Sequence, residues 1–218
     1  MSTVALPPKS RNAYAMVKSS KLDRAIDHAR GILENKLSNK LKFHNLRHTL
    51  DVISAVHIIG EKSNLDPGAM EVVVLAAWYH DTGFSKSYQN HEYESRQIAA
   101  KFLKQIDYPT DVISKILGCI RATRIPQKPL NLLERIICDA DLFHLSQSDY
   151  WTKNKLLREE LSLVFSRPIR DDQWCYENLN FLCQHDYHTP YGKEVLARLK
   201  NKHLKRNIEK LEALIKKA

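Results

Sequence analysis

The residues best suited to do chemistry are a histidine and an aspartate that are adjacent in the sequence, His80 and Asp81. They follow the most apolar run of the chain, residues 72–77, at the edge of a segment that we expect to be buried. A charged group in that place must be hydrated, paired or bound to a metal. Imidazole nitrogen and carboxylate oxygen suit a divalent transition metal, or a harder ion such as Mn²⁺ or Mg²⁺.

Three further groups of polar residues border apolar segments. His44 and His48 are four residues apart, a spacing that on a helix places both side chains on one face, one turn apart. His91 follows a polar loop, and Asp139 and Asp141 end another apolar run. A single histidine on a helical face is usually structural. Together with the His-Asp pair these groups favour a metal site, although spacing alone does not decide it.

The order and context of these residues resemble the HD-domain superfamily of metal-dependent phosphohydrolases. The nearest pattern is a bacterial branch that reads Y/F-H-N-x-x-H-T, W-x-H-D-x-G-Y/F, N-H-E-x-x-S, A-T-x-x-P-Q and D-A-D-L. The corresponding segments are Phe43 to Thr49, Trp78 to Phe84, Asn90 to Ser95, Ala122 to Gln127, and Asp139 to Leu142. The first is also similar to the H-N-x-x-H motif of cyclic-nucleotide phosphodiesterases. A bare His-Asp pair is a weak signal, but five ordered motifs over residues 20–190 are specific.

The resemblance implies four metal ligands. They are His48, His80, Asp81 and Asp141, of which Asp141 is preferred over Asp139 because the family's last ligand has an A-D-L-like context. Asp139 would instead orient a ligand or a water. The metal is a divalent ion, one of Mn, Mg, Fe, Co, Ni or Zn, and its identity is open.

The resemblance also implies catalytic roles. His44 matches the position that protonates the leaving group in the phosphodiesterases, and Asp81 would orient the nucleophile as well as bind the metal. His91 matches a position that supports a second metal or contacts phosphate. A divalent ion lowers the pKa of a bound water from about 16 toward 7, which makes hydroxide available for attack on phosphorus.

Four basic residues are candidates to hold the non-reacting phosphate oxygens: Arg47, Lys86, Arg121 and Arg124. Ordinary surface charge is the alternative reading for all four, and it is preferred for Lys86. The segment 120–124 lacks the extra histidine of many two-metal relatives. We therefore expect one tightly bound metal, with a second one weak or absent.

Several other histidines are expected to be structural or to line a rim. A second His-Asp pair, His185 and Asp186, lies in a polar turn after an amphipathic segment. His57, His144 and His203 are interpreted in the same way.

Composition favours a single helical domain. The chain has 218 residues, of which 43% are hydrophobic, with only 6 glycines and 8 prolines. The apolar spacing is mostly helical, with one helix expected from about residue 43 to 61 and a central buried one at 69–81. We expect an all-α HD-domain bundle of about seven to nine helices around a central metal site. Residues 1–20 would form a loose arm, 21–190 the HD phosphohydrolase domain, and 191–218 a basic amphipathic helix.

Charge, apolar run length and cysteine content bear on the expected partners and cellular location of the protein. The formal net charge of +9 favours anionic partners, although a basic solvated face is the alternative. No stretch approaches the roughly 18 apolar residues needed to span a bilayer, and the start lacks an apolar signal region. The four cysteines form no C-x-x-C pair, which favours reduced thiols and a cytoplasmic location.

The predicted function is metal-dependent hydrolysis of a phosphate ester of a nucleotide-like or other small phosphorylated metabolite. The patterns of the guanosine tetraphosphate hydrolases and of the H-D-x-x-H phosphodiesterases are missing, so the substrate is open. The alternative is a catalytically weak nucleotide sensor or binding module in a bacterial signalling or defence system. Nucleic-acid processing is a weaker third hypothesis, and a homodimer is left open.

Overall fold

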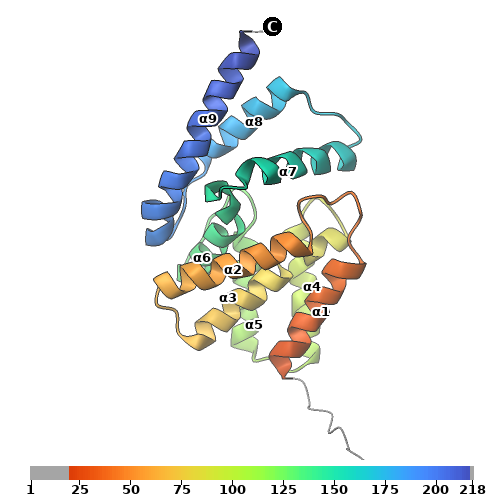
Figure 1. Cartoon of the computed structure of the whole chain (residues 1–218). Helices are drawn as coiled ribbons and strands as arrows, with labels where there is room; N and C mark the ends of the chain where they lie inside the picture. The colour runs from red at the N-terminus through yellow and green to blue at the C-terminus, as the bar shows by residue number, and fades with distance from the viewer. Residues whose placement is uncertain (1–19, 217–218) are drawn as a thin grey trace, which may run out of the picture.

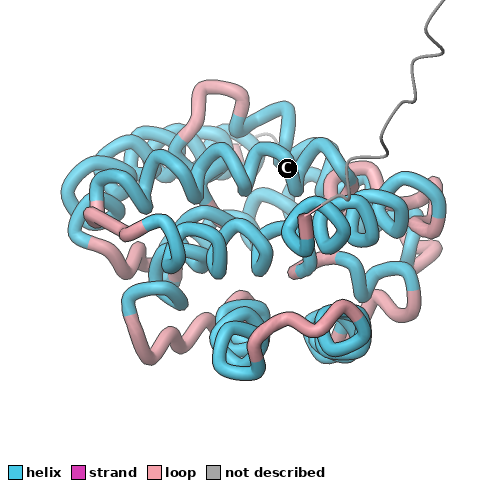
Figure 2. The backbone as a smooth tube through the Cα atoms, turned by 90° about the horizontal axis from the view of Figure 1, so that it is seen from below, coloured by secondary structure: helices cyan, strands magenta, loops and turns pink. Residues whose placement is uncertain are grey.

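The computed structural model describes residues 20–216, and in this part of the chain all regular structure is helical (Figures 1 and 2). The all-α prediction is confirmed. The nine α-helices are α1 (Lys21–Asn35), α2 (Leu46–Lys62), α3 (Pro67–Tyr79), α4 (His91–Gln105), α5 (Thr110–Ala122), α6 (Leu132–Asp141), α7 (Tyr150–Val164), α8 (Asp171–Gln184) and α9 (Ala197–Ile215). Short 3₁₀ turns follow α3 (Thr82–Ser85) and α6 (Phe143–Ser146), and a π-helical turn (Gly192–Leu196) leads into α9. The predicted N-terminal arm, except for residue 20, lies outside the described residues.

Helix α3 lies at the centre of the bundle and contacts α1, α2, α4, α5 and α6. It begins sharply because the Asp66 carboxylate accepts a hydrogen bond from the Ala69 amide at 2.9 Å, with Pro67 in the first turn. Its last turns are buried on every side, as an apolar helix without a polar face must be. The main core of the protein is therefore built around the helix that ends at the His-Asp pair.

Helices α7, α8 and α9 lie together at one end of the molecule (Figure 1). A second, smaller apolar cluster joins α7 and α8 to the turn after α6, and Leu204 of α9 packs against it. The predicted C-terminal helix is present, and α9 packs along α8. Its Lys200 is buried and donates hydrogen bonds to the carbonyl oxygens of Leu182, at 2.9 Å, and His185. The division of the chain at residues 20 and 190 stays a prediction.

The expected start of the second helix was wrong. Helix α2 begins at Leu46, not near residue 43, because the extended Asn45 caps it: the side-chain oxygen of Asn45 accepts hydrogen bonds from the amides of Arg47 and His48. His44 therefore precedes the helix, and its four-residue spacing from His48 does not describe one helical face. The two imidazole rings still lie close, with centroids 5.7 Å apart.

No helix within residues 20–216 is long and apolar enough to cross a membrane. The four cysteines are free; three of them are buried and Cys183 is exposed.

The turn after α3 depends on a glycine. The amide of Gly83 donates to the Ser95 hydroxyl at 2.8 Å, and that hydroxyl donates to the carbonyl oxygen of His80 at 2.5 Å. A Cβ atom at Gly83 would lie 1.9 Å from the carbonyl oxygen of His91, so this close approach to α4 requires glycine.

We predict that Gly83→Ala lowers the free energy of unfolding by about 3 kcal/mol, because the backbone of α4 must move away from the site. Gly31→Ala is the matched control: its added Cβ meets nothing within 4 Å, and it is expected to stabilise α1 by about 0.5–1 kcal/mol. Urea denaturation of both variants measures the difference. Equal effects of the two substitutions would contradict this account of the turn.

Candidate metal centre

Three helix ends bring the predicted ligands together in the core. His48 lies in the first turn of α2, His80 and Asp81 directly follow α3, and Asp141 is the last residue of α6. One ligand atom each of His48, His80 and Asp141 lies within 4.8 Å of the others, so these three can hold a metal ion. His48 Nε2 is 3.2 Å and His80 Nε2 3.5 Å from Asp141 Oδ1. Asp81 Oδ2 is 3.2 Å from His80 Nε2 and 3.6 Å from His48 Nε2.

The chemistry of this donor set fits a divalent cation. His80 Nε2 and Asp81 Oδ2 are buried 3.2 Å apart, and within residues 20–216 neither makes a hydrogen bond of normal geometry, which is costly for polar atoms unless an ion or water satisfies them. His80 Nδ1 donates to the carbonyl oxygen of Ala77 at 2.7 Å, so Nε2 is the nitrogen that would bind a cation on losing its proton. Mixed imidazole and carboxylate donors in this arrangement suit Zn, Mn, Fe, Co or Ni.

Both carboxylates of the cluster are held ionised. Burial opposes their charge, but the positive charge of the neighbouring His80 imidazole lowers the pKa of Asp81 far below its usual value. For Asp141, the hydrogen bond with His48 and the charge of His80 likewise outweigh burial and hold its pKa well below the usual range. The cluster therefore offers two ionised carboxylates to a cation at neutral pH.

A buried glutamate on α7 orients His44. The ring nitrogen Nδ1 of His44 pairs with Glu160, whose carboxylate also accepts hydrogen bonds from the amides of Phe43 and His44, at 2.8 and 2.9 Å, and from the Tyr88 hydroxyl, at 3.0 Å. Burial disfavours the charged imidazole, but the bond to Glu160 and the nearby carboxylates outweigh it and raise the pKa of His44. The sequence analysis assigned no role to Glu160, because a single glutamate among the charged residues of an amphipathic helix is normally expected to face solvent.

His91, in the first turn of α4, lies beside the cluster. Its Nε2 is 3.6 Å from Asp81 Oδ1 and 3.7 Å from Glu92 Oε1, and its ring stacks on Phe84 with centroids 3.8 Å apart. The structure therefore places His91 beside Asp81, and its role in supporting a second metal or contacting phosphate stays a prediction.

The three arginines predicted to bind phosphate lie elsewhere. The side chain of Arg47 is 84% exposed and pairs with Asp51 at 3.2 Å. Arg121 pairs with Glu134 at 3.3 Å in a groove between α5 and α6. Arg124 is exposed in the loop after α5. The structure does not bring these side chains to the cluster.

Asp139 anchors a loop and makes no contact with the ligands. It is buried, and its carboxylate accepts hydrogen bonds from the His188 amide at 2.7 Å and from the amide and hydroxyl of Thr189 at 2.9 and 2.6 Å. Burial raises the pKa of Asp139, although these bonds oppose the shift. Its hydrogen bonds thus hold the segment after α8, and its role in orienting a ligand or a water stays a prediction.

A cavity of about 180 Å³ opens beside the ligand cluster, and its other walls are mostly apolar. Helices α7 and α8 contribute Leu157 and Phe181, and the loop after α5 contributes Ile125. His144 also lines it, although its sequence context indicated a structural role; burial and the charge of His48 lower the pKa of His144 to about 3, so it is neutral. The apolar walls explain why sequence patterns of polar residues did not identify them.

The second His-Asp pair lies at an adjoining cavity of about 290 Å³, which shares Ile125 and Phe181 with the first. His185 and Asp186 line this neighbouring space, in keeping with the predicted rim position. Both ring nitrogens of His185 are buried and make no hydrogen bond with any residue that the structure describes. Burial, together with the charge of Lys200, lowers the pKa of His185 to about 3.

The comparisons agree with this architecture. Residues 45–146, slightly less than half of the chain, match the family model of the HD domain. The crystal structure of a predicted HD superfamily hydrolase from an uncultured Thermotogales bacterium is similar, with a TM-score of 0.56 and 16% identity over 93% of this chain and 95% of that chain. No curated protein matches the sequence significantly. The chain thus has the HD-domain fold, while the bacterial branch and the similarity to phosphodiesterases stay predictions.

We predict that His185 contributes to acid sensitivity. Its folded-state pKa lies below the ordinary value, so the unfolded chain binds the proton more readily and stability is lost as the pH falls below about 6.5 toward 3. His185→Phe should lose less unfolding free energy than the wild type between about pH 7 and pH 5 in urea denaturation. The exposed His57→Phe should behave like the wild type. Equal losses in all three proteins would refute the assignment.

We also predict that Mn²⁺ raises the thermal midpoint of the metal-free wild type by about 5 °C or more, because an ion bound only by the folded state stabilises it. His80→Asn removes a central ligand and should abolish the shift. His57→Asn, an exposed histidine of α2, should keep it. An undiminished shift in His80→Asn would mean that the ion binds elsewhere.

Proposed function

We propose that the protein is a metal-dependent phosphohydrolase of the HD family that cleaves a phosphate ester. One observation carries the proposal: His48, His80, Asp81 and Asp141 converge from three helix ends and leave two buried donor atoms unsatisfied. These four residues would hold a divalent metal ion. When bound, the ion supplies an activated water and neutralises phosphate oxygens.

Three residues at or beside the metal site would supply the other catalytic roles. Asp81 orients the attacking water, since its second oxygen, Oδ1, faces His91 and the cavity rather than His80. His44, held by Glu160 and favoured in its protonated form, donates a proton to the departing oxygen. His91 contacts a phosphate oxygen from the other side of Asp81.

The volume and lining of the cavity limit the size and chemical class of substrate that can bind. The volume of about 180 Å³ and the apolar walls suit a small phosphorylated metabolite or part of a nucleotide, and no lysine or arginine is among the described residues that line the cavity. The phosphate would be held by the metal ion and the histidines instead. The apolar walls would accept a sugar or a base edge, with the adjoining cavity of about 290 Å³ available to a longer substrate.

The lack of a lysine or arginine among the lining residues that the structure describes also favours a second candidate, a catalytically weak nucleotide sensor in a bacterial signalling or defence system. Without a guanidinium clamp, transition-state charge is stabilised less, while binding by the metal and the walls persists. A nucleotide that raises the thermal midpoint in the presence of Mn²⁺ and is not turned over would support this candidate.

The direct test is an assay of the metal-loaded protein with Mn²⁺, Mg²⁺, Co²⁺ or Ni²⁺ against nucleotides and phosphomonoesters. We expect phosphate release that falls by at least about a hundredfold in Asp81→Asn. Asp51→Asn, a carboxylate on the outer part of α2, is the control that should retain activity. Release that is the same in Asp81→Asn as in the wild type would reject the catalytic proposal.

Glu160→Gln tests the assigned acid. The substitution removes the charge that raises the pKa of His44, so less of the imidazole is protonated, and kcat should fall at least about tenfold with a smaller effect on KM. A general acid must carry its proton, so the alkaline fall of the kcat–pH profile should move to lower pH. The exposed neighbour Glu159→Gln should leave the profile unchanged. An unaltered profile in Glu160→Gln would remove His44 from this role.

A further inference from the structure

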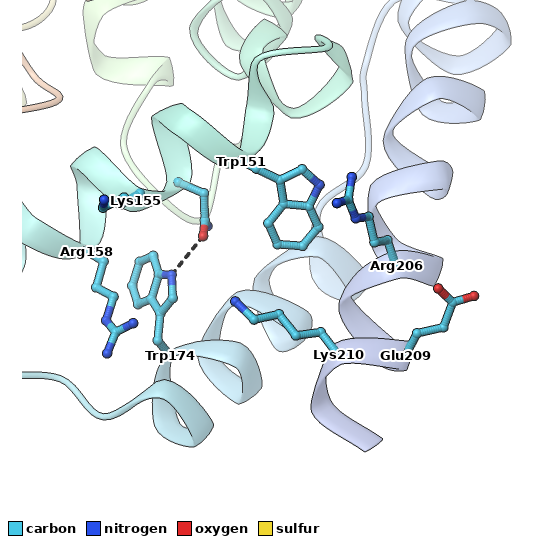
Figure 3. Close-up of a pocket in the computed structure, with 8 residues that line it drawn as sticks. Trp151, Lys155, Arg158, Trp174, Arg206, Glu209 and Lys210 are labelled. Atoms are coloured by element: carbon cyan, nitrogen blue, oxygen red, sulfur yellow. Dashed lines mark hydrogen bonds between the residues drawn. The ribbon is translucent and has the colours of Figure 1, made fainter. Parts of the chain in front are cut away.

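A groove between α7, α8 and α9 has a volume of about 650 Å³ (Figure 3). It shares no lining residue with the cavity at the ligand cluster, whose volume is about 180 Å³. A space of this size is in the range of pockets that bind small organic ligands. The proposed hydrolysis does not use it.

The groove is strongly basic. Four cationic side chains line it, Lys155, Arg158, Arg206 and Lys210, against the single carboxylate of Glu209. Asp171 neutralises Arg158 at 2.5 Å, but within residues 20–216 the other three cations make no hydrogen bond or ion pair. Arg206 and Lys210 are also one helical turn apart, where like charges repel. An anion in the groove would relieve this repulsion.

Trp151 adds a donor that lacks an acceptor. Its indole Nε1 is buried and finds no hydrogen-bond partner among the described residues. The guanidinium carbon of Arg206 lies 5.4 Å and the ammonium of Lys210 5.7 Å from the ring centre, and in Figure 3 the indole nitrogen points toward Arg206. Three groups that can only donate hydrogen bonds therefore meet here, and an anionic oxygen is the ligand atom that would satisfy them.

The floor of the groove is held by a network that joins all three helices. The indole nitrogen of Trp174 donates to Asn154 at 2.8 Å, and the amide of Asn154 donates to Asn178 at 2.8 Å. Asn178 in turn donates to the buried Asn207 at 3.0 Å. Because these groups are satisfied by one another, the groove is formed before any ligand arrives, which lowers the cost of binding.

We propose that this groove is a second ligand site, separate from the metal centre, that binds a nucleoside phosphate. The phosphate oxygens accept hydrogen bonds from Arg206, Lys210 and Lys155, and the base lies against the tryptophan-lined wall, where stacking and apolar contact stabilise it. A mononucleotide matches the bounded volume and the mixture of cations and indole rings better than a long polyanion, since Glu209 interrupts the positive charge.

Isothermal titration of the full chain with AMP, ribose 5-phosphate and inorganic phosphate tests the proposal, with EDTA present to suppress metal-dependent binding and turnover. AMP should bind most tightly, and more weakly as salt is raised. The double variant R206Q/K210Q should weaken AMP binding at least about tenfold. The matched variant K202Q/K205Q removes two exposed lysines of the same helix outside the groove and should stay within about twofold of the wild type.

Lys155→Gln, on α7, is an independent variant that should weaken AMP binding by about threefold without touching α9. Equal losses in the two double variants, or no AMP binding by the wild type, would overturn the proposal. Equal affinity for AMP and ribose 5-phosphate would overturn the assignment of a nucleoside. A single-stranded oligonucleotide that binds much more tightly than AMP, and loses this in R206Q/K210Q, would replace the nucleotide site with a nucleic-acid surface.

Discussion

The structure depends on a group of titratable side chains that the core must keep close together and away from water. Two imidazoles and two carboxylates meet at the ends of α2, α3 and α6, and two of their buried atoms make no hydrogen bond of normal geometry within residues 20–216. Such an arrangement is costly unless a cation completes it. Burial of the apolar side chains around α3 offsets the free-energy cost of burying this cluster. Gly83 lets the chain turn directly after Asp81 and pack against α4.

The helix α7 links the two functional regions that we propose. One side of α7 carries Glu160, which holds His44, and Leu157, which lines the cavity at the cluster. Another side carries Trp151 and Lys155, which line the basic groove. Part of the net charge of +9 lies in this groove, where three cations make no ion pair with any described residue, whereas the described lining of the cavity at the cluster contains no lysine or arginine.

The all-α fold could be predicted because its signal, apolar helical spacing, is local. The four metal ligands followed from ordered motifs that resemble the HD-domain superfamily, since spacing alone left a metal site open, and they stay a prediction. Sequence could not decide what depends on tertiary contacts. The three arginines were candidates to bind phosphate, with surface charge as the alternative, and Arg47 and Arg121 have carboxylate partners on the surface. Glu160 was missed because its partner, His44, lies 116 residues away, and no local pattern reports such a pair.

The central claim is that one divalent ion occupies the cluster, and anomalous diffraction from crystals grown with Mn²⁺ tests it most directly. The account predicts one strong peak within about 2 Å of donor atoms of His48, His80, Asp81 and Asp141. A peak held by other residues, or no peak at the cluster in a protein that binds Mn²⁺ in solution, would contradict it.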